Sequence, residues 1–169
     1  HDKSLKIKEA IGNKKGMAAS LGNIGLIYKN QGNYEQALEY FDKALKIFQE
    51  IDYKLGIANA YGNIGIIYKI QGNYEQALEY HDKSLKIKEA IGNKKGMAAS
   101  LGNIGLIYKN QGNYEQALAY FDKALKIFQE IDYKLGIANA YGNIGIIYKI
   151  QGNYEQASEY HDKSLQNKD

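Results

Sequence analysis

The sequence predicts an all-α protein, a solenoid of antiparallel helix hairpins, and three observations support this. The sequence of residues 1–80 is repeated at 81–160 with two differences, Glu39 against Ala119 and Leu78 against Ser158. Each half is itself a weaker duplication, since 1–40 and 41–80 match at most positions. A repeat of this length buries its apolar face against its neighbours. Apolar residues inside each unit recur at steps of three and four without strict alternation, which indicates helices.

Each unit contains two helices separated by a glycine turn. In the first copy, the first helix should run from about Lys15 to Asn30 and stop at Gly32, because glycine readily adopts a left-handed C-terminal cap. The second helix should begin after Asn33, whose side-chain oxygen can accept a free backbone N–H, and end near Ile51. Its apolar stripe includes Tyr34, Leu38, Phe41 and Leu45.

The junctions between units alternate in chemistry, with Gly12 and Asn13 at one and Asp52 and Tyr53 at the next. Glycine can end the old helix and aspartate can cap the new one, so both should form the same corner. No linker or change in composition marks a second domain. We therefore expect a single array over residues 1–169, divided into a partial helix at 1–11 and four hairpins at 12–51, 52–91, 92–131 and 132–169.

The residues at matching places in all four copies resemble the tetratricopeptide repeat. In the first copy they are Leu21, Ile24, Gly25, Tyr28, Gly32, Tyr34, Ala37, Phe41 and Ala44. The resemblance implies a right-handed superhelix and a role in binding proteins or peptides. The unit is longer than the usual one of the family, and the chain has no proline to close the second helix. The longer unit is similar to the repeats of kinesin light chains, spindle-orientation adaptors and bacterial peptide-pheromone receptors.

The first helix of each unit contains three glycines, which in the first copy are Gly16, Gly22 and Gly25. A glycine costs about 1 kcal/mol relative to alanine in a helix interior, so a compensating role is expected. Gly25 matches the close-packing position of the resembled family, where the partner helix approaches. Gly22 shares a different face with Asn23 and Leu26, and the resemblance implies that this face lines the concave wall of the superhelix.

An asparagine follows that glycine in every unit, at Asn23, Asn63, Asn103 and Asn143. A carboxamide offers both a donor and an acceptor, as the backbone of a bound peptide requires. In the resembled peptide-binding proteins, asparagines at this place hold the ligand backbone, so the same role is expected here. Asn59 and Asn139 lie one turn earlier on the same face in alternate repeats. The other interpretation, that these are surface residues duplicated with their repeats, stays open.

A row of lysines follows one or two turns further along, at Lys29, Lys69, Lys109 and Lys149. This row would favour acidic side chains or a C-terminal carboxylate in the ligand. A solvated face without a ligand is the alternative. The expected partner is an extended peptide or the tail of a protein, with acidic character if the lysine row contacts it.

Composition argues against several other functions. The formal net charge is only +3, and all 22 basic residues are lysine, whereas phosphate-reading surfaces use arginine, so nucleic acid is not an expected partner. No apolar run is long enough for a membrane span or a signal peptide, so we expect no membrane partner and favour a soluble, cytoplasmic chain. The absence of cysteine excludes disulfides and thiolate metal sites and is compatible with either redox compartment.

No group of residues in the sequence is typical of an enzyme, so we expect no catalytic residues, cofactor or metal. The letters from Gly22 to Gly25 resemble a phosphate loop, but they fall within a helix and follow no strand. The histidines, His1, His81 and His161, are separated by two repeat units each, which is too far for a shared metal. They replace Phe41 in every second repeat, so partly buried structural histidines are expected.

Near-identical repeats can pack between chains as they do within one, and we expect a tendency to end-to-end association or exchange of units. The predicted function is a protein-interaction scaffold that binds an extended peptide through the repeated asparagines. The alternative is a structural or self-assembling array, natural or engineered, with no specific ligand.

Overall fold

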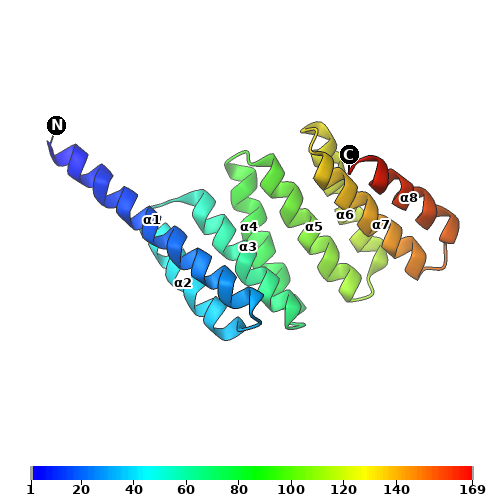
Figure 1. The fold of residues 1–169 in the computed structure, drawn as a ribbon, viewed down its shortest axis with the longest axis horizontal. Coiled ribbons are helices and arrows are strands. Elements are labelled where there is room, and N and C mark those ends of the chain that lie inside the picture. Colours follow the sequence, from blue (N-terminus) through cyan, green and yellow to red (C-terminus); the bar gives the residue numbers. More distant parts are fainter. Residues whose placement is uncertain (1, 169) are drawn as a thin grey trace. The chain divides into compact units, whose positions relative to one another are not determined.

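The computed structural model describes residues 2–168, except for the side chains of residues 2 and 5. Within this range the chain forms eight helices and no strand (Figure 1). The helices are α1 (Asp2–Asn30), α2 (Tyr34–Glu50), α3 (Lys54–Ile70), α4 (Tyr74–Ala90), α5 (Lys94–Asn110), α6 (Tyr114–Glu130), α7 (Lys134–Ile150) and α8 (Tyr154–Gln166). The predicted all-α fold of repeated helix hairpins is confirmed.

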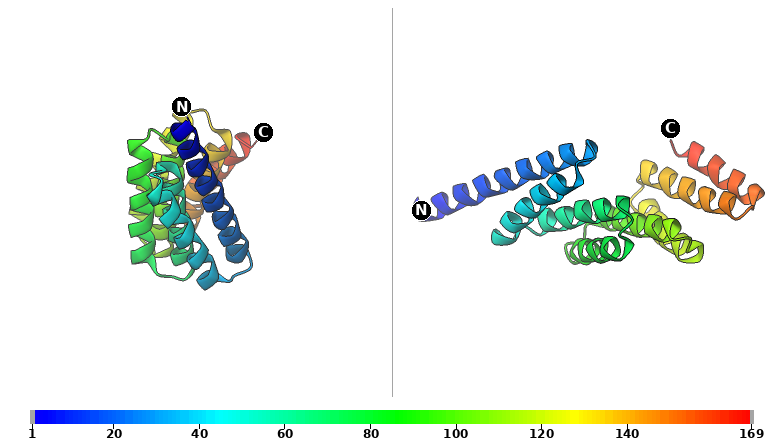
Figure 2. Two further views of the ribbon diagram at one scale, coloured as in Figure 1. Left: turned by 90° about the vertical axis from the view of Figure 1, so that its left-hand side faces the viewer. Right: turned by 90° about the horizontal axis from the view of Figure 1, so that it is seen from below.

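The chain divides into two compact units, residues 1–87 and 88–169. In the first unit, α1 packs along α2 and α2 along α3; in the second, α5, α6, α7 and α8 pack in the same sequential way. Successive helices of a hairpin run antiparallel, as Figures 1 and 2 show. The hairpin repeat is thus present in both units, while their union into one continuous array stays a prediction.

The turns confirm one predicted cap and correct another. Gly32 has a φ of +78°, the left-handed C-terminal cap that the sequence predicts. Asp52 has a φ of +52°, and the next helix begins only after Tyr53. The prediction that Asp52 caps the new helix is therefore wrong, because aspartate instead takes the left-handed place that Gly92 takes in the alternate corner. A short polar side chain tolerates this conformation better than most.

The asparagines before the second helices do not all cap through their side chains. Asn33 precedes α2, but it makes no capping hydrogen bond, contrary to the prediction. In the same turn of the last repeat, the side chain of Asn153 accepts a hydrogen bond from the backbone N–H of Gln156 at 3.3 Å. The backbone bond from the N–H of Ala37 to the carbonyl of Asn33, at 3.0 Å, starts α2 without the side chain.

The N-terminal segment folds differently from its identical copy at 81–100. In that copy, α4 ends at Ala90 and Gly92 turns the chain with a φ of +70°. Near the N-terminus, α1 continues through Gly12 and extends past the end of α2 (Figures 1 and 2), so the corner predicted at this glycine is wrong. Residues 2–11 and 82–91 have the same sequence, so local helix propensity does not explain the difference between the two segments.

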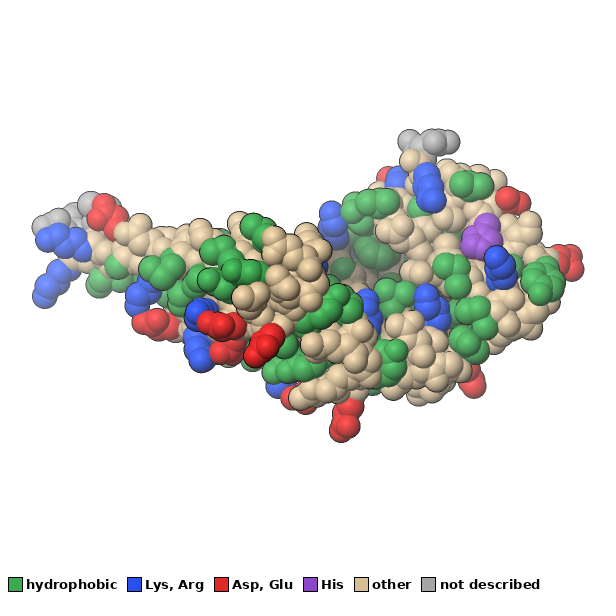
Figure 3. Space-filling view, turned by 60° about the horizontal axis from the view of Figure 1, so that its bottom comes forward, with side chains coloured by type: hydrophobic (Ala, Val, Ile, Leu, Met, Phe, Trp, Pro, Cys, Tyr) green, Lys and Arg blue, Asp and Glu red, His purple; other side chains and the backbone are tan. Residues whose placement is uncertain are grey.

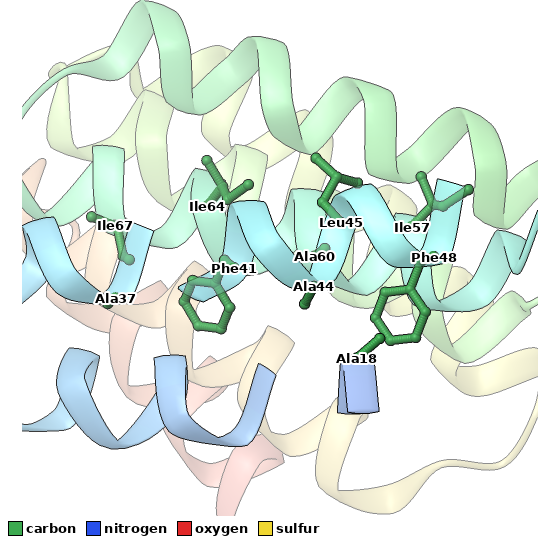
Figure 4. Packing of buried hydrophobic residues seen from close by; sticks show 10 residues of the cluster. All are labelled: Ala18, Ala37, Phe41, Ala44, Leu45, Phe48, Ile57, Ala60, Ile64 and Ile67. Atoms are coloured by element: carbon green, nitrogen blue, oxygen red, sulfur yellow. The ribbon is translucent and has the colours of Figure 1, made fainter. Parts of the chain in front are cut away.

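The core of the first unit forms where α2 lies between α1 and α3. The rings of Phe41 and Phe48 point from α2 toward α1, with Ala18 beside Phe48 (Figure 4). A β-carbon at Gly25 would lie only 2.8 Å from the Phe41 ring, so this glycine lets the aromatic ring reach the α1 backbone. The close-packing role predicted for Gly25 is confirmed.

Helix α4 has polar side chains at core positions where α2 has apolar ones. His81 occupies the place of Phe41, is only 1% exposed, and lies 2.9 Å from where a β-carbon of Gly65 would be. Its predicted structural role is supported, and it is buried more deeply than expected. His161 is half-buried, and His1 lies outside the described residues.

Lys88 occupies the place of Phe48, and the sequence reasoning did not single it out. Its side chain is buried, and its ammonium group donates a hydrogen bond to Oγ of Ser100 at 3.2 Å. A β-carbon at Gly96 would lie 2.9 Å from Cδ of Lys88, so the lysine stem packs where the phenylalanine ring packs elsewhere. Burial lowers the pKa of Lys88, because removal from water disfavours the charged form.

Candidate functional site

The predicted asparagines of the first unit surround a pocket between α1 and α3. Asn23 comes from α1, Asn59 and Asn63 come from α3, and α2 closes the bottom. The pocket has a volume of about 280 Å³. Its lining consists of Lys15, Ala18, Ala19, Gly22, Asn23, Leu26, Phe41, Ala44, Phe48, Tyr53, Gly56, Asn59, Ala60 and Asn63.

The second unit contains the same pocket between α5 and α7, above α6, with a volume of about 290 Å³. Every lining residue is the duplicate of one in the first pocket, so the asparagines here are Asn103, Asn139 and Asn143. Each unit therefore brings three predicted asparagines together around one pocket.

The floor of each pocket is apolar and the rim is polar. In the first unit, Phe41, Ala44 and Ala18 at the floor are at most 1% exposed. At the rim, Asn23 and Asn59 are exposed and Asn63 is half-buried. An apolar group entering the pocket would lose contact with water, while its polar neighbours would meet carboxamides.

On the first helix of each pocket, Gly22 and Gly102 line the wall without a side chain. A β-carbon at either residue would meet no atom within 4 Å, whereas one at Gly25 would strike Phe41. The close packing of the hairpin therefore does not require Gly22. Its absent side chain leaves the pocket open and the α1 backbone accessible.

Each pocket also has a lysine held over a tyrosine ring. The Nζ atom of Lys15 lies 4.1 Å from the ring centre of Tyr53, and that of Lys95 lies 4.0 Å from the ring centre of Tyr133. These contacts are cation–π interactions. Among the described residues that line each pocket, the lysine is the only charged side chain.

The sequence reasoning missed Lys15 and Lys95, although a signal was present. Residues 15, 19, 22 and 26 follow one another at steps of three and four, so Lys15 lies on the helix face already assigned to Gly22 and Leu26. Tyr53 was missed because it lies in a corner between two repeats, outside the helical pattern.

The predicted row of lysines lies elsewhere. Lys29, Lys69, Lys109 and Lys149 are in the last turns of their helices, and none lines either pocket. A cation there interacts favourably with the partial negative charge of a helix C-terminus.

Several other surface charges are paired along the helices. Lys43 and Glu39, one turn apart on α2, form an ion pair at 2.6 Å. On the face that Figure 3 shows, lysines are dispersed among acidic and apolar side chains. Within residues 2–168, no cluster of three or more potential metal-ligating side chains occurs, and no helix is both long and apolar enough to cross a bilayer.

The chain repeats one helix hairpin in sequence, and a pocket lies between the first helices of successive hairpins. This arrangement defines a helical-repeat protein. The tetratricopeptide repeat profile matches residues 16–90 and 96–169, so the chain belongs to this family. No curated protein matches the chain significantly.

Solved structures share the fold at low sequence identity. BtubC (BKLC) from P. vanneervenii is 21% identical, with a TM-score of 0.78 over 89% of this chain and 62% of that one. Aspartyl phosphate phosphatase F from Bacillus subtilis is 24% identical, with a TM-score of 0.86 over 91% of this chain and 40% of that one. A Rap protein complexed with Competence and Sporulation Factor is 21% identical, with a TM-score of 0.83 over 90% and 43%. The chain thus spans less than two thirds of each of these proteins.

Proposed function

We propose that this chain is a protein-interaction scaffold that holds an extended peptide, or the tail of a partner protein, in its pockets. The observation that carries the proposal is the recurrence of one pocket in both units, each with an apolar floor and three asparagines at its mouth. The structurally similar Rap protein was solved complexed with Competence and Sporulation Factor, which is consistent with a binding role for this fold.

The chemistry of the pocket suits a peptide. An extended backbone presents N–H and C=O groups outside any helix or sheet, and carboxamides such as those of Asn23 and Asn63 can satisfy both. The volumes of about 280 and 290 Å³ lie at the small end of the range for ligand pockets, so each would take one bulky side chain of the peptide.

The proposal includes the four asparagines that recur in the repeats as contacts for the peptide backbone: Asn23, Asn63, Asn103 and Asn143. It also includes the lysine row. Because that row lies outside the pockets, it would attract acidic ligands over a distance and would not contact the buried side chain.

A peptide array would test the function with one asparagine removed from each pocket, through Asn63→Ala combined with Asn143→Ala. Each lost carboxamide removes hydrogen bonds worth about 1 kcal/mol net, so a selected peptide that contacts one pocket should bind roughly five times more weakly, and one that contacts both roughly thirty times more weakly. The matched control is Asn30→Ala combined with Asn110→Ala, two exposed asparagines outside both linings, which should bind as the wild type does.

Wild-type protein that selects no reproducible peptide would contradict the proposal, as would equal weakening by both pairs of substitutions. Light scattering on the same samples would show whether the chain self-associates, as near-identical repeats allow. A concentration-dependent mass without any selected peptide would favour the structural array instead.

A further inference from the structure

We propose that Lys15 and Lys95 recognise a carboxylate next to the side chain that fills each pocket, and that the two pockets act as two equal sites. The ligand class is then a peptide segment with a bulky apolar side chain beside an aspartate or glutamate. The inference rests on the proposed peptide-binding function and adds its charge selectivity and stoichiometry.

The neighbours of these lysines show why they, and not the lysines next to them, are available to a ligand. Lys14 forms an ion pair with Glu50 at 2.5 Å, and Lys94 forms one with Glu130. Among the described residues, Lys15 and Lys95 make no ion pair and lie only over tyrosine rings. Within each adjacent pair, the first lysine is ion-paired within the protein, and the second lines the pocket without an acidic partner among the described residues.

The tyrosine ring holds the ammonium group at the mouth without neutralising it. A cation–π contact at an exposed site is weak, so a carboxylate can compete for the same ammonium group. No acidic side chain among the described residues lines either pocket, so an incoming anion meets one positive charge and no repulsion from the lining. The same charge would repel a cationic ligand, so the pocket should bind anionic groups in preference to cationic ones.

Two equal sites follow from the duplicated block. The two linings are identical residue for residue, their volumes are about 280 and 290 Å³, and the two lysine–tyrosine distances are 4.1 and 4.0 Å. Each pocket is formed within one compact unit. A peptide short enough to occupy one pocket should therefore bind twice per chain with one affinity.

The test is an NMR titration of the full chain with two blocked tetrapeptides that differ in charge, acetyl-Ala-Phe-Asp-Ala-amide and acetyl-Ala-Phe-Asn-Ala-amide. We expect the aspartate probe to bind about 1.5- to fivefold more tightly, the range for an exposed ion pair. Lys15→Met combined with Lys95→Met keeps the apolar stems and should make the two probes bind equally.

The matched control is Lys29→Met combined with Lys109→Met, which removes two lysines from the same helices but outside the pockets. It should preserve the preference for aspartate. If this control abolishes the preference, or if the preference survives loss of Lys15 and Lys95, the charge assignment is wrong.

The stoichiometry is tested by blocking one pocket at a time. Gly22→Leu places a side chain into the open space of the first pocket, and Gly102→Leu does the same in the second. Two probe molecules should bind per wild-type chain and one per chain of either single variant. The thermal unfolding transition of each variant should be no lower than that of the wild type, which shows that the variant is folded. One bound molecule per wild-type chain, or two per variant, overturns the two-site assignment.

The outcomes also separate this inference from the function on which it rests. Array peptides that bind while the two probes show no difference would reject the inference alone. If neither array peptides nor probes bind the wild type, the proposed function fails as well.

Discussion

At the scale of single residues, the glycines of the first helices have two different roles. Gly25 and Gly105 are packing residues, since a β-carbon at either would lie 2.8 Å from a phenylalanine ring. Gly22 and Gly102 face open space on the pocket wall. Each reduces helix propensity, and the packing of the hairpin does not account for its presence.

This difference predicts opposite effects of the same substitution. Gly22→Ala combined with Gly102→Ala should raise the free energy of unfolding by about 1 kcal/mol per site, because alanine is the better helix former. Gly25→Ala combined with Gly105→Ala should lower it by about 1–3 kcal/mol per site, because each methyl group overpacks the core. Urea unfolding of both double variants measures this, and effects of the same sign would contradict the assignment of roles.

At the scale of elements, one sequence forms two structures. Residues 81–100 make the end of α4, a turn and the start of α5, whereas residues 2–20 belong to one continuous helix. In the copy, Ser84 donates a hydrogen bond to the carbonyl of Ala58 on α3 at 2.8 Å, which holds α4 against that helix. Local propensity is the same in both places, so tertiary contact decides whether the glycine turns.

The same substitution at the two equivalent glycines should therefore act differently. Gly92→Ala should lower the free energy of unfolding by about 1–2 kcal/mol, because alanine disfavours the φ of +70° found there. Gly12→Ala lies in a helix interior and should slow amide exchange around residues 8–16, with a gain in stability of at most about 1 kcal/mol. Destabilisation by Gly12→Ala would indicate that residue 12 forms a corner in solution.

At the scale of the whole molecule, the hairpins alternate between an apolar and a polar core. Phe41, Ala44 and Phe48 of α2 recur in α6, whereas α4 has His81, Ser84 and Lys88 in their places. Burial of polar groups is less favourable than burial of apolar ones, so we expect the α4 hairpin to be less stable than those of α2 and α6. Its buried lysine makes this weakness dependent on pH.

Lys88→Met should raise the free energy of unfolding at pH 7 by about 1–3 kcal/mol, because it removes a buried charge and keeps the apolar stem. The folded-state pKa of Lys88 lies below its ordinary value of 10.5, so between those two values the unfolded chain binds more protons. The wild type should therefore gain stability as the pH rises toward 10.5, and its difference from the variant should shrink.

Urea unfolding of both proteins across this pH range is the measurement. Lys46→Met, at an exposed lysine paired with Asp42 at 2.9 Å, is the control and should change stability by less than about 1 kcal/mol. A constant difference between the wild type and Lys88→Met at all pH values would show that Lys88 stays charged throughout.

Much of the fold and part of the candidate site could be predicted from the sequence. The repeat and the helical period gave the hairpins, and the shared face of Gly22 and Asn23 indicated the residues that line the pockets. The lysine row was placed on the same face, but the residues at the pocket mouth are Lys15 and Lys95. Helical periodicity gives a residue's direction around the axis, but it does not show which part of the face lies opposite the next hairpin.

The sequence by itself therefore determined the repeat, the helix pairs and the glycine turn inside each hairpin, because these depend on local propensity and on a pattern within one repeat. Only the tertiary structure decided that Asp52 adopts the left-handed conformation, that Gly12 stays helical, and that Lys88 is buried. It also decided which lysine meets Tyr53 at the pocket. These outcomes depend on contacts between residues far apart in the chain, and identical local sequences leave them undetermined.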